Sequence, residues 1–157
     1  MLFRSLAEEL RSSDYSIRRV VGIILRSKHF YAESAIRQRV KAPVEFTAGL
    51  LRALDVPRGT VPMLAVASSC DRQGQALFSP PNVKGWEGGR SWLGSSAVLE
   101  RGNWIADFVW GNPDFGIVPF EPLAWAERNR IPKGRIVTTL LNLFNQSDLS
   151  PKARTLI

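Results

Sequence analysis

Apolar side chains recur at helical spacing along most of the chain. The clearest stripe consists of Ile17, Val20, Val21, Ile24 and Leu25. These positions follow the i, i+3, i+4, i+7, i+8 pattern, which places them on one face of a helix. Ser13 or Asp14 is expected to cap this helix, because its side-chain oxygen can accept a hydrogen bond from the free amides of the first turn.

A second helix is predicted to begin at Pro43 and to end near Pro57 and Gly59. Proline suits the first position of a helix because its φ angle is already helical and it has no amide hydrogen to leave unpaired. Glu45 lies near the positive end of the helix dipole. The apolar face of this helix is predicted to consist of Val44, Thr47, Leu50, Leu51 and Leu54.

Two further helices are predicted on either side of a long loop. The first runs from about Thr60 to Arg72, and Gly74 can supply the left-handed residue that ends it. The second is expected to be capped by Ser95 or Ser96. Its apolar residues include Leu99, Ile105, Phe108 and Val109.

The last third of the chain shows turn residues at positions 111–116, followed by helices that open at Pro122 and Pro132. The second of these helices carries Ile136, Val137, Leu140, Leu141 and Phe144. Ser150 and Pro151 form a further helix start. Because no stretch shows sustained period-two alternation, the sequence predicts an all-α fold: an irregular bundle of about five to seven helices with one long ordered loop.

The loop, residues 77–92, is rich in Trp, Gly and Pro. Structureless loops longer than about 12–15 residues are uncommon and tend to be functional or disordered. Phe78, Trp86 and Trp92 are large apolar side chains that are expected to anchor the loop on the helices, which argues for order. The prolines stiffen its entry, and its glycines permit tight turns.

Two interpretations of the loop remain open. In the structural one, the indoles hold the loop against the helices. In the functional one, the loop forms a surface for glycans or peptides, because aromatic faces suit sugar rings and peptide backbones. The candidate ligand-binding residues are Asn82, Lys84, Trp86, Glu87, Arg90 and Trp92. The glycine spacing matches neither a phosphate-binding loop nor a dinucleotide-binding motif.

Composition narrows the choice of partners. The chain of 157 residues has a formal charge of +7 and a pI of about 10.3, so nucleic acid must be considered. Its basic residues, however, are spread from Arg4 to Arg154 without forming a block, so a nucleic-acid partner is not favoured. The sequence has no apolar run long enough to span a membrane, and its start does not resemble a signal peptide.

One cysteine and one histidine leave little room for metal or nucleophile chemistry. A Cys/His zinc site needs more ligands than one chain offers here, and we predict no metal, no cofactor and no catalytic residue. Cys70 is interpreted as a buried apolar residue and His29 as a helix-terminal residue. An alternative is a hydrolase-like enzyme that pairs Glu87 with Asp107 or Glu100, which would require two carboxyl groups of different pKa.

The loop is also a family signature. The segments GQALFSPPNVKGWEGGRSW (residues 74–92), ILRSKHFY (24–31) and VKAPVEF (40–46) resemble, in the right order, the bacterial domain-of-unknown-function 1800 family. The resemblance is strongest over residues 15–110 and continues more weakly to Ile157. Ala42 and Ala76 stand where the family often has a polar residue and a proline, which would alter turn stiffness and leave the chemistry unchanged.

The resemblance implies a place in a longer protein and supplies no mechanism. Family members are longer, so residues 1–157 are expected to form one helical region, an excerpt of the C-terminal part of such a protein. Members often look exported, which implies a parent protein of the cell envelope and leaves the location of this chain open. The leading hypothesis is a non-catalytic helical module that binds the N-terminal part of its parent or another envelope protein.

Overall fold

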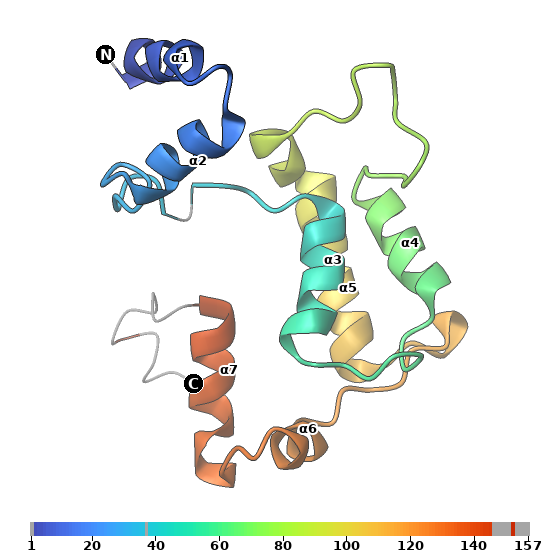
Figure 1. Cartoon of the computed structure of the whole chain (residues 1–157). Coiled ribbons are helices and arrows are strands. Elements are labelled where there is room, and N and C mark those ends of the chain that lie inside the picture. Colours follow the sequence, from blue (N-terminus) through green and yellow to red (C-terminus); the bar gives the residue numbers. More distant parts are fainter. Residues whose placement is uncertain (1, 37, 146–151, 153–157) are drawn as a thin grey trace. The chain divides into compact units, whose positions relative to one another are not determined.

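A computed structural model describes residues 2–36, 38–145 and 152, and its regular elements are helical (Figure 1). In this part of the chain the only β-type pairing is an isolated bridge between Asn112 and Ile117. The predicted all-α class is confirmed. The described residues form an irregular bundle with seven α-helices and three short 3-10 helices. The chain divides into two compact units, Met1–Val40 and Lys41–Ile157.

The first unit contains α1 (Leu2–Ser12) and α2 (Ile17–Arg26). The prediction of α2 is confirmed, but its expected cap is wrong. Ser16 occupies the N-cap position without a side-chain hydrogen bond, whereas Asp14 has a positive φ of 53°. Asp14 therefore belongs to the turn that ends α1, a position where the short polar side chain of Asp tolerates left-handed backbone.

In the second unit, α3 (Pro43–Ala53) begins at the predicted proline. The Glu45 carboxylate accepts a hydrogen bond of 2.9 Å from the Ala42 amide, which satisfies one free donor of the first turn. The next helix, α4 (Met63–Arg72), begins three residues later than predicted because Pro62 takes the N-cap position. Gly74 has the expected positive φ, 93°, just beyond the end of α4.

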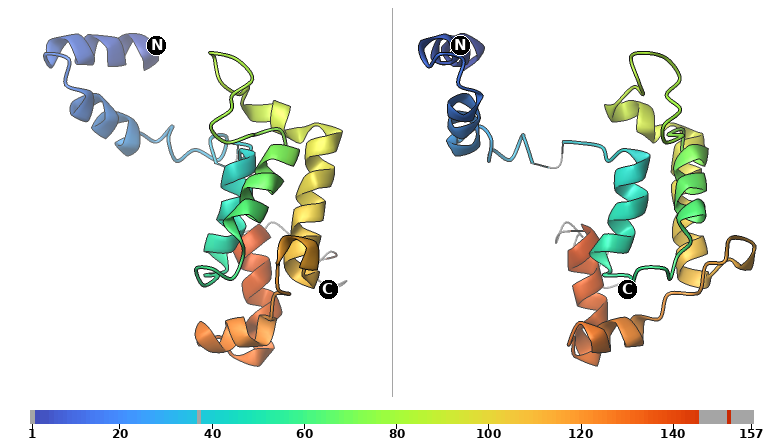
Figure 2. Two further views of the ribbon diagram at one scale, coloured as in Figure 1. Left: turned by 90° about the vertical axis from the view of Figure 1, so that its right-hand side faces the viewer. Right: turned by 45° about the vertical axis from the view of Figure 1, so that its right-hand side comes forward.

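The helix after the long loop, α5 (Ser95–Trp110), follows a 3-10 helix, η1 (Gly89–Leu93). Neither Ser95 nor Ser96 caps it: the N-cap is Gly94, and no side chain bonds to the first turn. Figure 2 shows α3, α4 and α5 running side by side as the centre of this unit. The chain then leaves α5 through Gly111, whose φ is 80°.

The remaining elements are η2 (Pro113–Phe115), α6 (Pro122–Arg128), η3 (Lys133–Arg135) and α7 (Ile136–Asn145). The predicted opening of α6 at its proline is confirmed. Pro132 opens a short 3-10 turn that leads into α7, as a residue of fixed φ can do. The further helix start predicted at positions 150–151 lies outside the described residues.

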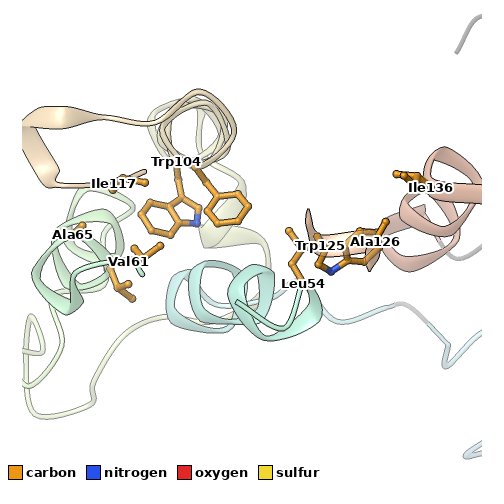
Figure 3. Packing of buried hydrophobic residues seen from close by; sticks show 10 residues of the cluster. Leu54, Val61, Ala65, Trp104, Ile117, Trp125, Ala126 and Ile136 are labelled. Carbon is orange, nitrogen blue, oxygen red and sulfur yellow. The ribbon is translucent and has the colours of Figure 1, made fainter. Parts of the chain in front are cut away.

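The hydrophobic core of the second unit is built around two buried indoles (Figure 3). Trp104 of α5 is fully buried and lies among Val61, Ala65 and Ile117. Trp125 of α6 lies beside Leu54 at the end of α3. The buried members of this cluster are Leu54, Val61, Ala65, Val66, Trp104, Phe108, Ile117, Trp125, Ala126 and Ile136. The core therefore joins α4, α5, α6 and the start of α7 to the end of α3.

Candidate functional site

The Trp/Gly/Pro loop folds through local turns before it reaches η1. The Asn82 side chain accepts a hydrogen bond of 2.9 Å from the Lys84 amide, and the Asn82 carbonyl accepts one of 3.0 Å from the Gly85 amide. Gly85 has a φ of 90°, which this tight turn requires and which other residues adopt with strain. The loop is thus shaped by its own backbone, as its composition predicts.

The six candidate ligand-binding residues do not share one environment. Trp92 is buried, with 8% of its surface exposed, and Trp86 is half-buried. Lys84, Glu87 and Arg90 are exposed. Asn82 is exposed as well. Trp92 therefore serves as the anchor of the loop, and the polar residues with Trp86 are the part of the candidate site that solvent reaches.

Phe78 departs from the expectation that it anchors the loop. Its side chain is 100% exposed, and its backbone has a φ of 65°. A bulky side chain in the left-handed region is an outlier, because its Cβ crowds the neighbouring backbone. Val83, further along the same loop, is also fully exposed. The tip of the loop thus presents apolar side chains to solvent.

The carboxylates of the enzymatic alternative lie in separate contexts. Glu100 of α5 forms an ion pair with Arg72 of α4, with an Oε2–Nε distance of 3.0 Å. Asp107 accepts a hydrogen bond of 2.8 Å from the Asn112 side chain. Glu87 lies exposed in the loop. Glu100 thus links α5 to α4, and Asp107 links the end of α5 to the turn that follows it.

Cys70 is buried in a polar cluster between α3 and α4. Burial raises the pKa of the Cys70 thiol, and a hydrogen bond with Thr47 opposes that effect. The Gln73 amide group donates to the hydroxyls of Thr47 and Ser69, each at 3.0 Å. His29 is exposed, in the other unit. Within residues 2–36, 38–145 and 152, no group of three or more His, Cys, Asp or Glu could hold a metal ion.

The feature that sequence reasoning missed is an apolar groove of about 630 Å³ in the second unit. It is lined by residues of α3, α5 and α7, together with Phe120 and Pro122. The lining residues are Lys41, Phe46, Gly49, Leu50, Ala53, Leu54, Ile105, Phe108, Val109, Phe120, Pro122, Leu140, Leu143 and Phe144. Among these, Lys41 alone is charged.

One side of the groove belongs to the core, and its α7 side is partly exposed. Phe108 and Phe120 stack with their ring centroids 5.3 Å apart, and both belong to the core or pack against it. On the α7 side, Leu140 packs against the core, whereas Leu143 and Phe144 are 38% and 46% exposed. Among the described residues, the groove therefore combines exposed apolar side chains of α7 with aromatic rings of the core.

A signal for this groove was present in the sequence. The stripe predicted for the last helix, from Ile136 to Phe144, is longer than the core requires: Ile136 is buried, whereas Phe144, which lines the groove, is exposed. An apolar stripe that extends beyond its own core indicates a surface that another element can cover.

No helix in the described part of the chain is both long and apolar enough to cross a membrane. Comparison with curated proteins finds no match, and comparison with solved structures finds none. A family described as "Protein of unknown function (DUF1800)" matches over residues 1–157, the whole of the sequence. The family expected from the loop signature is thus confirmed: the chain belongs to the DUF1800 family.

Proposed function

We propose that this chain is a non-catalytic helical module that binds an amphipathic helix of a protein partner in the groove between α3, α5 and α7. The observation that carries the proposal is the groove itself, with its apolar lining and partly exposed α7 side. Contiguous exposed apolar surface is unfavourable in water, and on soluble domains it commonly marks an interaction site.

The dimensions of the groove favour a helix. α3 has eleven residues and α7 has ten. The lining positions run from Phe46 to Ala53 on α3 and from Leu140 to Phe144 on α7, about 10 Å and about 6 Å at 1.5 Å per residue, which corresponds to one to two turns of a partner helix. Such a helix would insert apolar side chains at positions i, i+3 or i+4, and i+7, the pattern used in helix-in-groove recognition.

Charge gives the expected orientation of the partner. Lys41 lies at the edge of the groove, and its carbonyl oxygen accepts a hydrogen bond of 2.7 Å from Arg101. Arg101 also lies over the Phe46 ring, 4.8 Å from its centroid. Two cations therefore lie at this end of the groove, so the partner helix should carry an acidic residue where it passes them.

The test uses a displayed library of helical peptides selected on the whole chain. Ala53 is an exposed residue of α3 in the lining of the groove, and Ala53→Trp fills the space without removing a core side chain. Ala124 is an exposed alanine of α6 outside that lining, so Ala124→Trp is the matched control. Selected peptides should lose at least about tenfold in affinity with Ala53→Trp only.

Two outcomes of this experiment would contradict the proposal. If no peptide is selected, yet an apolar dye binds the wild type and not Ala53→Trp, the groove takes a small apolar molecule and the helix proposal is wrong. Peptides that bind the wild type and Ala53→Trp equally would contradict it as well, because their site would lie elsewhere.

The second candidate function is ligand binding at the loop, and the conformation of Phe78 favours it. A left-handed backbone and a fully exposed ring at one bulky residue are unfavourable on their own. Such outliers are often retained at ligand-binding sites. The proposed ligand is a glycan or peptide that contacts Phe78 and Trp86 and reaches the polar groups of Asn82, Lys84 and Arg90.

Trp fluorescence titrated with cell-wall glycan and peptide fragments tests this site. The signal should change in the wild type, and its response should be lost in Trp86→Ala. Trp110, an exposed residue of α5, provides the control: Trp110→Ala should keep the response. No response to any fragment would contradict ligand binding by the loop.

The resemblance implies two candidate partners, the N-terminal part of a longer protein and another envelope protein. Both stay predictions. The hydrolase-like alternative also stays a prediction.

A further inference from the structure

The first unit carries an apolar strip that none of its described residues, 2–36 and 38–40, buries. On α2, residues Ile17, Val21, Ile24 and Leu25 are exposed by 37–73%. Their spacing of four, three and one residues places them on one face of the helix. In α2 as a whole, no residue is buried. The strip is therefore a continuous apolar surface on a short, well-formed helix.

The charged residues of α2 are all basic, although Ile23, outside the strip, is also exposed. The helix holds Arg18, Arg19 and Arg26 and no acidic residue. Arg19 forms an ion pair with Glu9 of α1, which ties the two helices together. Arg18 and Arg26 line a shallow hollow together with Val21 and Leu25, so cationic and apolar groups share one surface. Residues 1–40 contain eight Lys and Arg against four Asp and Glu, a formal charge of +4.

Exposed aromatic residues flank α2 at both ends. Tyr15 precedes it and is 67% exposed, and Tyr31 follows it and is 65% exposed. Phe30 is exposed as well and meets Tyr31 edge to face, with ring centroids 5.2 Å apart. Tyrosine rings favour the boundary between lipid chains and headgroups, because one end is apolar and the other forms hydrogen bonds.

We propose that α2 binds the surface of an anionic membrane, lying in its plane with the apolar strip at the boundary of the acyl chains. Arg18 and Arg26 would reach the headgroup phosphates while their aliphatic stems stay beside the strip. The combination of a basic face, an apolar face and flanking tyrosines is that of an interfacial helix. Nucleic acid would use the arginines and leave the apolar strip in water, so it fits less well.

The experiment measures co-sedimentation of the whole chain with vesicles. Vesicles of phosphatidylcholine with about 30% phosphatidylglycerol should bind the chain at least about tenfold more tightly than phosphatidylcholine alone. This preference should shrink in about 0.5 M salt, because salt screens the contribution of the arginines. Equal binding to both vesicles, or to neither, would overturn the proposal.

Matched variants locate the contact. Ile24→Glu places a charge in the strip and should weaken binding by about tenfold or more. Leu64→Glu changes an exposed leucine of α4 and should leave vesicle binding unchanged. Arg18→Gln with Arg26→Gln should remove the preference for anionic vesicles, whereas Arg128→Gln with Arg135→Gln, two exposed positions of the second unit, should keep it.

Circular dichroism of each variant confirms that its helices persist. Vesicle binding that survives Ile24→Glu would show that α2 is not the contact and would overturn the proposal. DNA binding that is lost in the Arg18 and Arg26 double variant, without vesicle binding, would assign the surface to nucleic acid instead. The proposal is independent of the groove, so Ala53→Trp should leave vesicle binding unchanged.

Discussion

At the scale of single residues, the polar side chains between α3 and α4 are as informative as the apolar ones. Thr47, Ser69 and Gln73 are buried. The Gln73 amide nitrogen has three acceptors: the Thr47 hydroxyl and the hydroxyl and carbonyl of Ser69. A buried donor that lost its acceptors would be strongly unfavourable, so this cluster fixes how the two helices meet.

Thr47→Val tests that cluster. The substitution keeps the shape of the side chain and removes one acceptor of Gln73, so the free energy of unfolding should fall by about 1–2 kcal/mol in urea titrations. Thr138, an exposed threonine of α7, is the control, and Thr138→Val should change the free energy by less than about 0.5 kcal/mol. Equal effects of the two substitutions would contradict a structural role for the cluster.

Cys70 provides a second test at this scale. Its side chain has no exposed surface, and burial raises the pKa of its thiol. Labelling by a thiol reagent should therefore be at least about a thousandfold slower in the native protein than in urea. Rapid labelling of the native protein would show that the helices open locally and would contradict the buried position.

The raised pKa of Cys70 also sets the sign of a pH effect. The unfolded thiol ionises near pH 8.5, and the folded thiol resists ionisation, so stability is complete below that pH and declines as the pH rises above it. The urea midpoint should therefore fall further between about pH 8 and about pH 10 in the wild type than in Cys70→Ala. A larger fall in the variant would reverse the sign and contradict this account.

The burial of individual loop side chains could be predicted from the sequence only in part. The composition of the loop predicted turns and an indole anchor, and Trp92 is buried accordingly. Phe78 was expected to behave in the same way and is fully exposed. Both rings are large and mainly apolar, so the path of the backbone, which depends on distant helices, decides which one is buried.

At the scale of elements, the helix starts that depend on proline were predictable, because proline acts through its own φ angle. Pro43 and Pro122 both open helices. The serine caps were not predictable: Gly94 takes the N-cap position ahead of Ser95. A side-chain cap competes with the approach of the preceding segment, here η1, and that approach is a tertiary property.

Gly102 inside α5 and Gly111 at its C-cap should respond to alanine with opposite signs. Gly102 lies within the helix, and an added Cβ would meet nothing within 4 Å. Gly102→Ala should therefore stabilise the chain by about 1 kcal/mol, because alanine restricts the unfolded backbone and favours helix. At Gly111, φ is 80° and an added Cβ would lie 2.7 Å from Cδ of Pro119. Gly111→Ala should cost about 2–4 kcal/mol.

Thermal melts of the two variants beside the wild type give the comparison directly. A destabilised Gly102→Ala would mean that α5 needs flexibility at its centre. A neutral Gly111→Ala would mean that the turn between α5 and Pro119 adapts, which the close approach of the two segments argues against.

The groove marks the limit of prediction at the scale of elements. The spacing of apolar residues predicted the apolar faces of α3, α5 and α7, and each of these faces was expected to lie in the core. Whether a face is covered depends on the spacing between helices far apart in the chain. The connection through α6 and η3 holds α7 by Ile136 at one end and leaves Phe144 exposed at the other.

At the scale of the whole molecule, the two units differ in how they are stabilised. The core cluster lies entirely within the second unit, from Leu54 to Ile136. In the first unit, no residue whose burial is described is buried. Isolated short helices are marginal in water, and packing of apolar faces supplies most of their stability. The first unit should therefore be the weaker one.

The aromatic residues make this difference measurable in the unmodified chain. All five tryptophans lie after residue 85 and both tyrosines before residue 32, so Trp fluorescence reports the second unit alone. In a urea titration, far-UV circular dichroism should show an early loss of helix, from α1 and α2, that Trp fluorescence does not follow. Coincident midpoints would mean that the units unfold together and would contradict separate stabilities.

Anionic vesicles should change only the first of these two transitions. A surface that binds folded α2 and not its unfolded form stabilises the fold by linkage, so the early transition should move to higher urea. The Trp transition should stay in place, because the second unit does not depend on α2 for its core. Ile24→Glu should abolish the shift, whereas Leu64→Glu, its match in the second unit, should keep it. A shift of the Trp transition alone would place the lipid contact in the second unit and would remove the reason for assigning it to α2.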